Sequence, residues 1–556
     1  MTALYRRWTL VAGALVASAC SSSEPSPPTG VDCAGVSSTS LAVGAFTVLD
    51  ASQTGCVRIP APGGTETEHL YVALATEGRE TSNGITATYE LEGGTGATAS
   101  VASPDRAVFD EVPTAAASFH DRLRTRERGL SEHPAAVDRP RISASVVPTP
   151  PVVGAKRTFD VCATTTCDSF VQSQATAKVV AQRVAIFVDD SAPADGYTQA
   201  DLDQVGALFD SHLYPIDTTA FGRESDLDDN GVVVVLLTQR VNELSPDCNS
   251  ANSVILGYFF GLDLLPSQSH SNDGEIFYGV VPGSATPGCT ISTTFAKENL
   301  PSVFVHEFQH MISFNQHVLV HQGTTEDIWL NEGLSHFAEE LAGRQVPDTF
   351  CPDLGNDCRS QFIGSNLNDA FKYLEDPEAN FAIEPTSSGG TLEERGANWL
   401  FVRWLADHFA ATQPLGTEFT RSLVQTSLIG SENVAAVTGE DFSLLVSQWQ
   451  MANFLDDLTG FTPASDRLQY SSFDFRTLFR VNFENGVFDK AYPLTPDSTR
   501  TGNYSHSGVL RGGSGKHLRI IQPAGAADAS FVLSAPGGST PVPSSVKPRI
   551  AIVRVR

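Results

Sequence analysis

Residues 303–317 read VFVHEFQHMISFNQH, and His306, Glu307 and His310 within them form the pattern His-Glu-x-x-His. Two histidines four positions apart on a helix lie on the same face, one turn from each other. Their imidazoles can then bind one metal ion together, and the glutamate between them is left free to act as a general base. The pattern alone also occurs on ordinary polar helix faces, so its interpretation depends on a third ligand elsewhere in the chain.

His317 and His321 are the histidines that follow this pattern most closely. In one large class of zinc peptidases the pattern extends to H-E-x-x-H-x-x-G-x-x-H. Here Ser313 replaces the glycine and Gln316 replaces the last histidine. On a continuing helix, His317 would lie about 10 Å beyond His310 along the axis, at about 1.5 Å per residue. We therefore expect His317 and His321 to be surface or helix-terminal residues rather than ligands.

A carboxylate further along the chain is the better candidate. The string WLNEGLSHFAEE at 329–340 contains Asn331-Glu332-Gly333, and 332 − 310 − 1 = 21 residues separate Glu332 from His310. That distance is sufficient to end one helix, cross a loop and begin a second helix beside the first. A glutamate added to two histidines gives the His₂Glu ligand set of thermolysin-like zinc sites.

The two motifs together resemble those of the gluzincin metallopeptidases, in which H-E-x-x-H is followed by N-E on the next helix. The string WLNEGLSHFAEE and the strands that precede it are most similar to the hyicolysin family of bacterial metallopeptidases. This resemblance covers roughly residues 155–460, and its specific part is 306–340. It implies one catalytic Zn²⁺ held by His306, His310 and Glu332.

The resemblance also implies a mechanism in which Glu307 takes a proton from a metal-activated water. Aminopeptidases of this clan carry a Gly-x-Met-Glu-Asn segment that holds the substrate amine. The present chain has only AKEN at 296–299, without the glycine or the methionine. An endopeptidase is therefore favoured over an aminopeptidase.

Four further residues are candidates for supporting roles. Glu339 lies seven residues after Glu332, on the same helix face, where it can orient a ligand histidine. His336 falls where thermolysin-like enzymes keep an aspartate, and it is a candidate donor in the cleft. Tyr373 and His408 are candidate oxyanion donors by residue type alone. The alternative for all four is ordinary packing or an ion pair.

Composition limits the classes of partner. The 556 residues include 36 basic and 64 acidic side chains, giving a net charge of −28. Such a surface repels nucleic acid and anionic lipid, so neither is expected as a partner. With 41% hydrophobic and 18% charged residues, the chain has the composition of a folded protein and is long enough for about three domains.

The first residues have the pattern of an export signal. A basic start is followed by TLVAGALVASA at 9–19, an apolar run too short to span a membrane. It ends at Cys20, before a Ser/Pro-rich tether at 21–32. This resembles a bacterial lipoprotein signal over residues 1–20, which implies lipidation of Cys20 and an outer-membrane or cell-surface location. Ordinary secretory cleavage after Ala19 is the alternative.

The other cysteines are even in number, as expected for disulfides in an exported protein. A cysteine metal site is the alternative, although no pair has the C-x-x-C spacing. Eight cysteines allow 105 connectivities, and pairing between neighbours is the simplest prediction. The predicted pairs are Cys33 with Cys56, Cys162 with Cys167, Cys248 with Cys289, and Cys351 with Cys358.

The predicted fold is multidomain. We expect an N-terminal β-sandwich with its linker at 33–150, a central α+β zincin-like peptidase domain at 155–460, and a C-terminal β domain at 465–556. Alternating runs such as EHLYVALAT predict the strands. A charged helix is predicted at 107–130, either as simple packing and linker or as an inhibitory propeptide element.

One loop resembles a calcium-binding loop. In DLDDNG at 226–231, Asp226, Asp228 and Asn230 occupy the first, third and fifth positions. The twelfth position is Leu237, where such loops require a bidentate glutamate. A polar turn before a buried strand is the alternative to structural Ca²⁺.

Taken together, these patterns predict an exported, lipid-anchored zinc endopeptidase that acts on extracellular proteins or peptides and meets the membrane only through its anchor. Two alternatives remain. One is an inactive surface lipoprotein that uses a peptidase fold for binding. The other is a zinc hydrolase of a non-peptide substrate.

Overall fold

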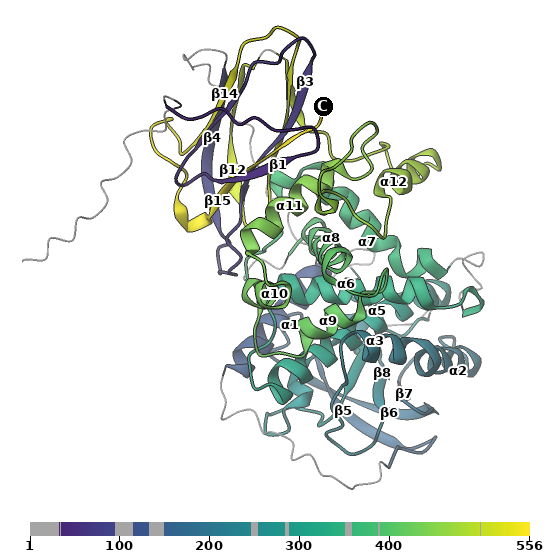
Figure 1. Cartoon of the computed structure of the whole chain (residues 1–556). Helices are drawn as coiled ribbons and strands as arrows, with labels where there is room; N and C mark the ends of the chain where they lie inside the picture. The colour runs from purple at the N-terminus through teal and green to yellow at the C-terminus, as the bar shows by residue number, and fades with distance from the viewer. Residues whose placement is uncertain are drawn as a thin grey trace, which may run out of the picture.

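The computed structural model (Figure 1) places a β-sandwich on one side of a helical region, with a mixed sheet on the other side. It describes residues 33, 35–94, 115–132, 149–245, 254–283, 289–350, 358–386, 390–500 and 502–556. The strands are β1 (Phe46–Asp50), β2 (Cys56–Ile59), β3 (Thr67–Ala75), β4 (Thr86–Gly94), β5 (Lys156–Cys162), β6 (Phe170–Val180), β7 (Val184–Asp189), β8 (Val233–Leu237), β9 (Gly257–Phe259), β10 (Ile276–Gly279), β11 (Asp497–Thr499), β12 (Tyr504–Arg511), β13 (Gly515–Gln522), β14 (Ala529–Ser534) and β15 (Pro548–Arg554).

Most of the helices lie between the sandwich and the mixed sheet. They are α1 (Ala115–Ser131), α2 (Gln199–Leu208), α3 (Tyr214–Ala220), α4 (Gln239–Leu244), α5 (Thr293–Phe314), α6 (Ile328–Gln345), α7 (Cys358–Glu375), α8 (Leu392–Phe409), α9 (Thr417–Val424), α10 (Gly430–Thr438), α11 (Phe442–Leu455) and α12 (Phe475–Glu484). Two π-helices extend this set, η1 (Phe209–Leu213) after α2 and η4 (Asn315–Val320) after α5. In the described residues, no helix combines the length and the apolar character needed to cross a membrane.

The sandwich is built from both ends of the chain, which corrects the prediction of two separate β domains. Its sheets have the strand orders β1-β15-β3-β13-β11 and β12-β4-β14-β2. The fully buried strand β3 pairs with β15 on one side and with β13 on the other. The N-terminal strands at 46–94 therefore have their partners at 497–554. A central strand must have a neighbour on each edge, and strand patterns alone do not say which segment supplies it.

The central sheet has the order β5-β6-β7-β8-β10-β9. Strands β7, β8 and β10 are parallel, whereas β9 runs antiparallel to β10 and forms one edge. The strand β8 is buried along its whole length, as expected for the continuous apolar run VVVLL between two parallel neighbours. The apolar runs in RVAIFVDD, GVVVVLLT and EIFYGVV form β7, β8 and β10.

Aromatic packing orients α5 on this sheet. The ring of Phe304 stacks on Phe277 of β10 and on Phe209 of η1, with centroids 4.9 and 4.4 Å apart. Phe308, one turn later, packs edge-on against Phe209. Since positions 304 and 308 face the sheet, the histidines at 306 and 310 are directed away from it, toward α6.

Two predicted disulfides form in the described residues, joining Cys33 to Cys56 and Cys162 to Cys167. Cys289 is also disulfide-bonded. Its predicted partner Cys248, the residue Cys351 and the side chain of Cys358 lie outside the described part of the chain, as do the signal and tether at 1–32.

Candidate metal centre

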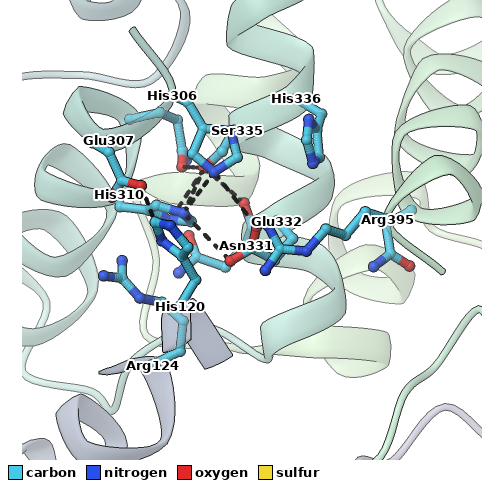
Figure 2. A network of polar contacts seen from close by, with 12 residues as sticks. His120, Arg124, His306, Glu307, His310, Asn331, Glu332, Ser335, His336 and Arg395 are labelled. Atoms are coloured by element: carbon cyan, nitrogen blue, oxygen red, sulfur yellow. Dashed lines mark hydrogen bonds and ion pairs between the residues drawn. The ribbon is translucent and has the colours of Figure 1, made fainter. Parts of the chain in front are cut away.

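The two histidines of α5 and Glu332 of α6 converge on one point (Figure 2). The Nε2 atoms of His306 and His310 are 3.2 Å apart. Glu332 places Oε2 3.5 Å from Nε2 of His306 and Oε1 3.5 Å from Nε2 of His310. All three side chains are buried, and their donor atoms lie within 4.8 Å of one another. The structure thus brings together three residues from two motifs, although 21 residues lie between His310 and Glu332 in the sequence.

These distances fit a metal ion. Two nitrogens that each bind zinc at about 2.0–2.1 Å with a tetrahedral angle are separated by about 3.3 Å. Neither carboxylate oxygen of Glu332 accepts a hydrogen bond, although the residue is fully buried. A buried charge is costly unless it is paired. The guanidinium of Arg395 lies 3.2 Å from Oε2, and a cation coordinated by Glu332 would add a partner for the carboxylate. The donor set, two imidazoles and one carboxylate, is one that binds zinc.

A small residue lets α8 approach this centre. A Cβ atom added to Gly333 would lie 2.8 Å from the backbone oxygen of Asn398. The glycine after Glu332 therefore permits close contact between α6 and α8. This contact places Arg395 of α8 with Nη1 3.2 Å from Oε2 of Glu332. Burial alone would raise the pKa of Glu332, but Arg395 and the two histidines lower it well below its usual range.

Glu339 holds His306 from the other side of its ring. Its Oε1 accepts a hydrogen bond from Nδ1 of His306 at 2.7 Å and lies 3.3 Å from Nδ1 of His336. This leaves Nε2 of His306 directed toward Glu332, which is the orientation a metal ligand needs. His306, His336 and Glu339 also lie close enough to form a second cluster. We favour the first cluster, because Glu339 is already engaged in a short hydrogen bond.

His336 lines the pocket at this centre. Its Nδ1 is 3.0 Å from Oδ1 of Asn366, which can only accept, so Nδ1 carries the proton.

The two candidate oxyanion donors are engaged elsewhere. The hydroxyl of Tyr373 contacts Ser514 and accepts a hydrogen bond from Gln450, and Nε2 of His408 bonds to the carbonyl of Gln469. Residue type alone does not indicate where a side chain lies, and both predictions are wrong.

His317 and His321 lie outside the metal-binding clusters of the described residues. His317 is not at the surface but lies in the last turn of the π-helix η4, the helix-terminal alternative of the prediction, where it is fully buried with Nε2 3.6 Å from Oε2 of Glu326. His321 is exposed at the end of that helix. The π-helical turns carry both residues past the centre.

Glu307 is buried next to the ligands and makes two contacts. Its Oε2 accepts the backbone N–H of Phe259 at 2.9 Å, and its Oε1 lies 3.2 Å from Nδ1 of His120. Burial would raise the pKa of Glu307, but His120, His310 and His306 together hold it far below its usual range. A carboxylate that is ionised and adjacent to the ligands is suited to accept a proton.

His120 belongs to α1, the charged helix that the sequence predicted as either packing and linker or an inhibitory propeptide element, without indicating which of its residues would reach this centre. Together with Gly257, Val303, His306 and Glu307, it lines a pocket at the centre. Oδ1 of Asp121, the next residue, accepts from Nη2 of Arg395 at 3.1 Å. The charged pattern FHDRLRTRERGL predicted the helix but not its location, because no local signal shows which surface a charged helix covers.

Arg395 and Ser335 were also missed. The hydroxyl of Ser335 lies 3.1 Å from Nδ1 of His310 and 2.5 Å from Oε1 of Gln309. Ser335 could have been found from its position one turn after Glu332 on the same helix face. Arg395 had no such signal, because it reaches the centre from a helix that follows more than 60 positions later.

The second candidate metal loop also forms a cluster in the structure. Asp226 and Asp228 are exposed in the turn before β8, and both lie close to Glu275. Asn230 uses its oxygen to accept the backbone N–H of Val232 at 2.7 Å.

A comparison with curated proteins supports a metallopeptidase relationship. The chain is 31% identical over 151 residues to the neutral metalloprotease ShpI of Staphylococcus hyicus. The match covers 27% of this chain and 32% of that protein, so the chain spans about a third of its relative's length. No family model matches the chain.

Proposed function

We propose that this protein is a zinc-dependent endopeptidase of the gluzincin type, close to the hyicolysin family, that hydrolyses extracellular proteins or peptides. The convergence of His306, His310 and Glu332 on one point, with the two histidine Nε2 atoms 3.2 Å apart, carries the proposal. Similarity to a neutral metalloprotease supports it.

Each residue of the centre has a distinct task in this proposal. A zinc ion bound by the two histidines and Glu332 would polarise the scissile carbonyl and lower the pKa of a water. Glu307 would take the proton of that water and pass it to the leaving amine. Glu339 keeps the ring of His306 in the ligand orientation through the 2.7 Å hydrogen bond.

The strand β9 is the proposed site for the substrate backbone. It is the edge of the six-stranded sheet, and the backbone N–H of its residue Phe259 reaches Glu307. Unpaired backbone groups at a sheet edge bind extended peptides by strand addition. A peptide paired with this edge would lie beside Glu307.

The proposed activity is tested by zinc content and by cleavage of casein, with chelation and zinc readdition as the control. Casein cleavage that a chelator abolishes and zinc restores is the expected result. Zinc binding without cleavage of any protein, both by the wild type and by the Arg124→Ala variant described below, would favour a hydrolase of a non-peptide substrate. A folded protein that neither binds zinc nor cleaves casein would favour a binding lipoprotein.

We further propose that α1 keeps this peptidase latent in the described conformation. Arg124 donates to the carbonyl of Phe259 at 2.6 Å, and Glu127 accepts the N–H of Gly261 at 2.6 Å. These are backbone groups at and just after β9, where a substrate would pair. At the same time His120 lies against the proposed base, Glu307. The helix α1 thus contacts both the edge of β9, where the substrate would pair, and the proposed base, Glu307.

Ion pairs also hold the C-terminal part of α1 in place. Arg128 bonds to Glu80 in the loop after β3 and to Asp327 at the start of α6, both at 2.9 Å. The strands at 46–94, which precede α1 in the chain, belong to the sandwich, where β3 is a central strand, so they do not form a separable segment. Activation would therefore require displacement of α1, or cleavage of the chain on both sides of it.

Arg124→Ala is expected to raise casein cleavage by about tenfold or more. A hydrogen bond from a charged donor contributes about 1.5–3 kcal/mol, so its loss shifts the population toward a displaced α1 by a factor of about 10–100. Initial rates and bound zinc are measured for the variant and for the wild-type protein. Arg122→Ala is the matched control, since Arg122 is exposed on the same helix and bonds to Thr165.

Equal rates for wild type and Arg124→Ala would show that α1 does not inhibit. If both proteins are inactive although they carry zinc, the peptidase proposal itself is in doubt.

We propose that the protein is exported and anchored to a bacterial outer membrane or cell surface through Cys20. Cys20→Ser is expected to move the protein from the membrane fraction to the soluble fraction without loss of fold, because stable anchoring needs the acyl chains that this thiol would carry. Fractionation followed by immunoblotting measures the distribution. A variant that still requires detergent for release would rule out this anchor.

A further inference from the structure

Three carboxylates gather where two parallel strands of the central sheet begin. Asp226 and Asp228 lie in the loop before β8, and Glu275 is the residue immediately before β10. Since β8 and β10 are parallel neighbours, with Ile276 opposite Val234, their first residues lie at the same edge of the sheet. One oxygen from each of the three carboxylates lies within 4.8 Å of the others.

Glu275 is the unusual member of this cluster, because it is buried. Only 1% of its surface is exposed. Its Oε1 accepts hydrogen bonds from the hydroxyl of Ser225 at 2.5 Å and from the N–H of Leu227 at 3.1 Å. Its Oε2 is buried and accepts none. A buried carboxylate oxygen without a donor, beside two other carboxylates, lacks a cationic partner.

The polar groups around the two aspartates do not supply that partner. Oδ1 of Asp226 accepts the N–H of Gly231 at 3.0 Å, and Oδ2 of Asp228 accepts the side-chain amide of Asn230 at 2.8 Å. The one guanidinium near the cluster in the described residues, that of Arg157, is 3.7 Å from Oδ2 of Asp228. Three carboxylates beside one guanidinium leave an excess of negative charge.

Protonation of Glu275 is the competing way to relieve this charge. Burial, together with the negative charge of Asp228, raises the pKa of Glu275 to about 7. The two hydrogen bonds that Oε1 accepts favour the ionised form. The two alternatives, a bound cation and a protonated Glu275, lead to different responses of the protein to added Ca²⁺, so an experiment can separate them.

We propose that Asp226, Asp228 and Glu275 bind a divalent, oxygen-preferring cation, most closely Ca²⁺. The donors in this cluster are carboxylate oxygens, the ligand type that calcium prefers and zinc does not require. Position twelve of the loop, Leu237, is buried inside β8 and cannot coordinate. Glu275, the residue before β10, would supply the carboxylate that the loop lacks at position twelve.

This site uses none of the residues of the candidate zinc centre. It joins the loop at 225–231 to the beginning of β10, the strand on which the substrate-edge strand β9 is paired. A cation there would fasten the loop and the two parallel strands to one another. Its expected effect is on the stability of the sheet, whether or not the protein is a peptidase.

Calcium titration of the chelator-stripped protein, followed by calorimetry and thermal melting, tests the site. To keep the zinc centre out of the measurement, all variants carry Glu332→Gln. We expect saturable Ca²⁺ binding with a dissociation constant of about 10⁻⁴–10⁻³ M, as in extracellular calcium modules. The melting temperature should rise with Ca²⁺ concentration, as for any ligand that binds only the folded state.

Glu275→Gln should abolish the calcium-induced rise in melting temperature, while melting without calcium stays at or above the value of its parent. Asp229→Asn is the matched control: it removes one charge from the same loop, its residue is outside the cluster, and its φ of 54° suits asparagine. The control should keep the full response. Absence of calcium binding by the parent protein would overturn the proposal. An equal loss of response in both variants would also overturn it, because a general charge effect would then explain the binding.

Discussion

Glu307→Gln is expected to retain its zinc and to lose about 10³-fold in peptide hydrolysis. The side chain is adjacent to the ligands but is not one of them, so the substitution leaves the metal-binding atoms in place. An amide cannot take the proton of a water, and general acid–base catalysis contributes about 10²–10⁴-fold. Glutamine also keeps an oxygen that can accept the N–H of Phe259, which preserves the local packing.

The measurement combines zinc content with the rate of casein cleavage. Because α1 is proposed to cover the site, the comparison is made in the Arg124→Ala background, where the rate before substitution is highest. Glu298→Gln is a suitable control, since Glu298 is on the same helix, nine residues before Glu307 and only partly buried. Wild-type rates in the Glu307→Gln protein would refute the role of Glu307 as the base.

Glu332→Gln is expected to weaken zinc binding by about a thousandfold or more. The loss of one of three protein ligands costs several kcal/mol, and about 1.4 kcal/mol corresponds to a factor of ten in affinity. Glutamine has a similar volume, so the contacts of Gly333 with α8 remain. The expected loss is larger than that for any neighbouring residue outside the ligand set.

Three further variants make this prediction quantitative. Glu339→Gln removes a carboxylate that orients His306, and it should weaken binding by about 10–100-fold, which is typical of residues that support a ligand. His321→Ala should have no effect on zinc, because His321 is exposed and outside the cluster. His317→Ala should keep its zinc but lose stability, since the imidazole is fully buried and its removal leaves a cavity.

Bound zinc per chain after dialysis against a weak chelator measures the series. Thermal melting shows whether each variant is folded, which matters because Arg395 loses its ion pair when Glu332 is neutralised. If Glu332→Gln keeps one tight zinc while folded His317→Ala is empty, a histidine-rich site would replace the proposed one.

The amino-acid sequence by itself determined the elements of the centre. The spacing of His306 and His310 places both on one face of a helix, because a helix turns once in 3.6 residues. The 21 residues before Glu332 allow a second helix, and α6 begins four residues before it. The strands β7, β8 and β10 also follow from local apolar patterns. In each case the signal lies within a short stretch, where the periodicity of the backbone fixes the direction of the side chains.

Only the tertiary structure decided which distant segments meet. It joined the strands at 46–94 to those at 497–554 in one sandwich, placed α1 against Glu307 and β9, and brought Glu275 to the loop that holds Asp226. Pairing between segments depends on shape, charge and backbone hydrogen bonds over long separations, and local patterns do not encode it. A strand pattern indicates that the segment pairs with other strands, and a charged helix pattern indicates a polar face. A buried glutamate must likewise have a partner for its charge, but none of these features identifies the partner. The partner itself is chosen only when the whole chain packs, because the free energy of each contact depends on everything that surrounds it.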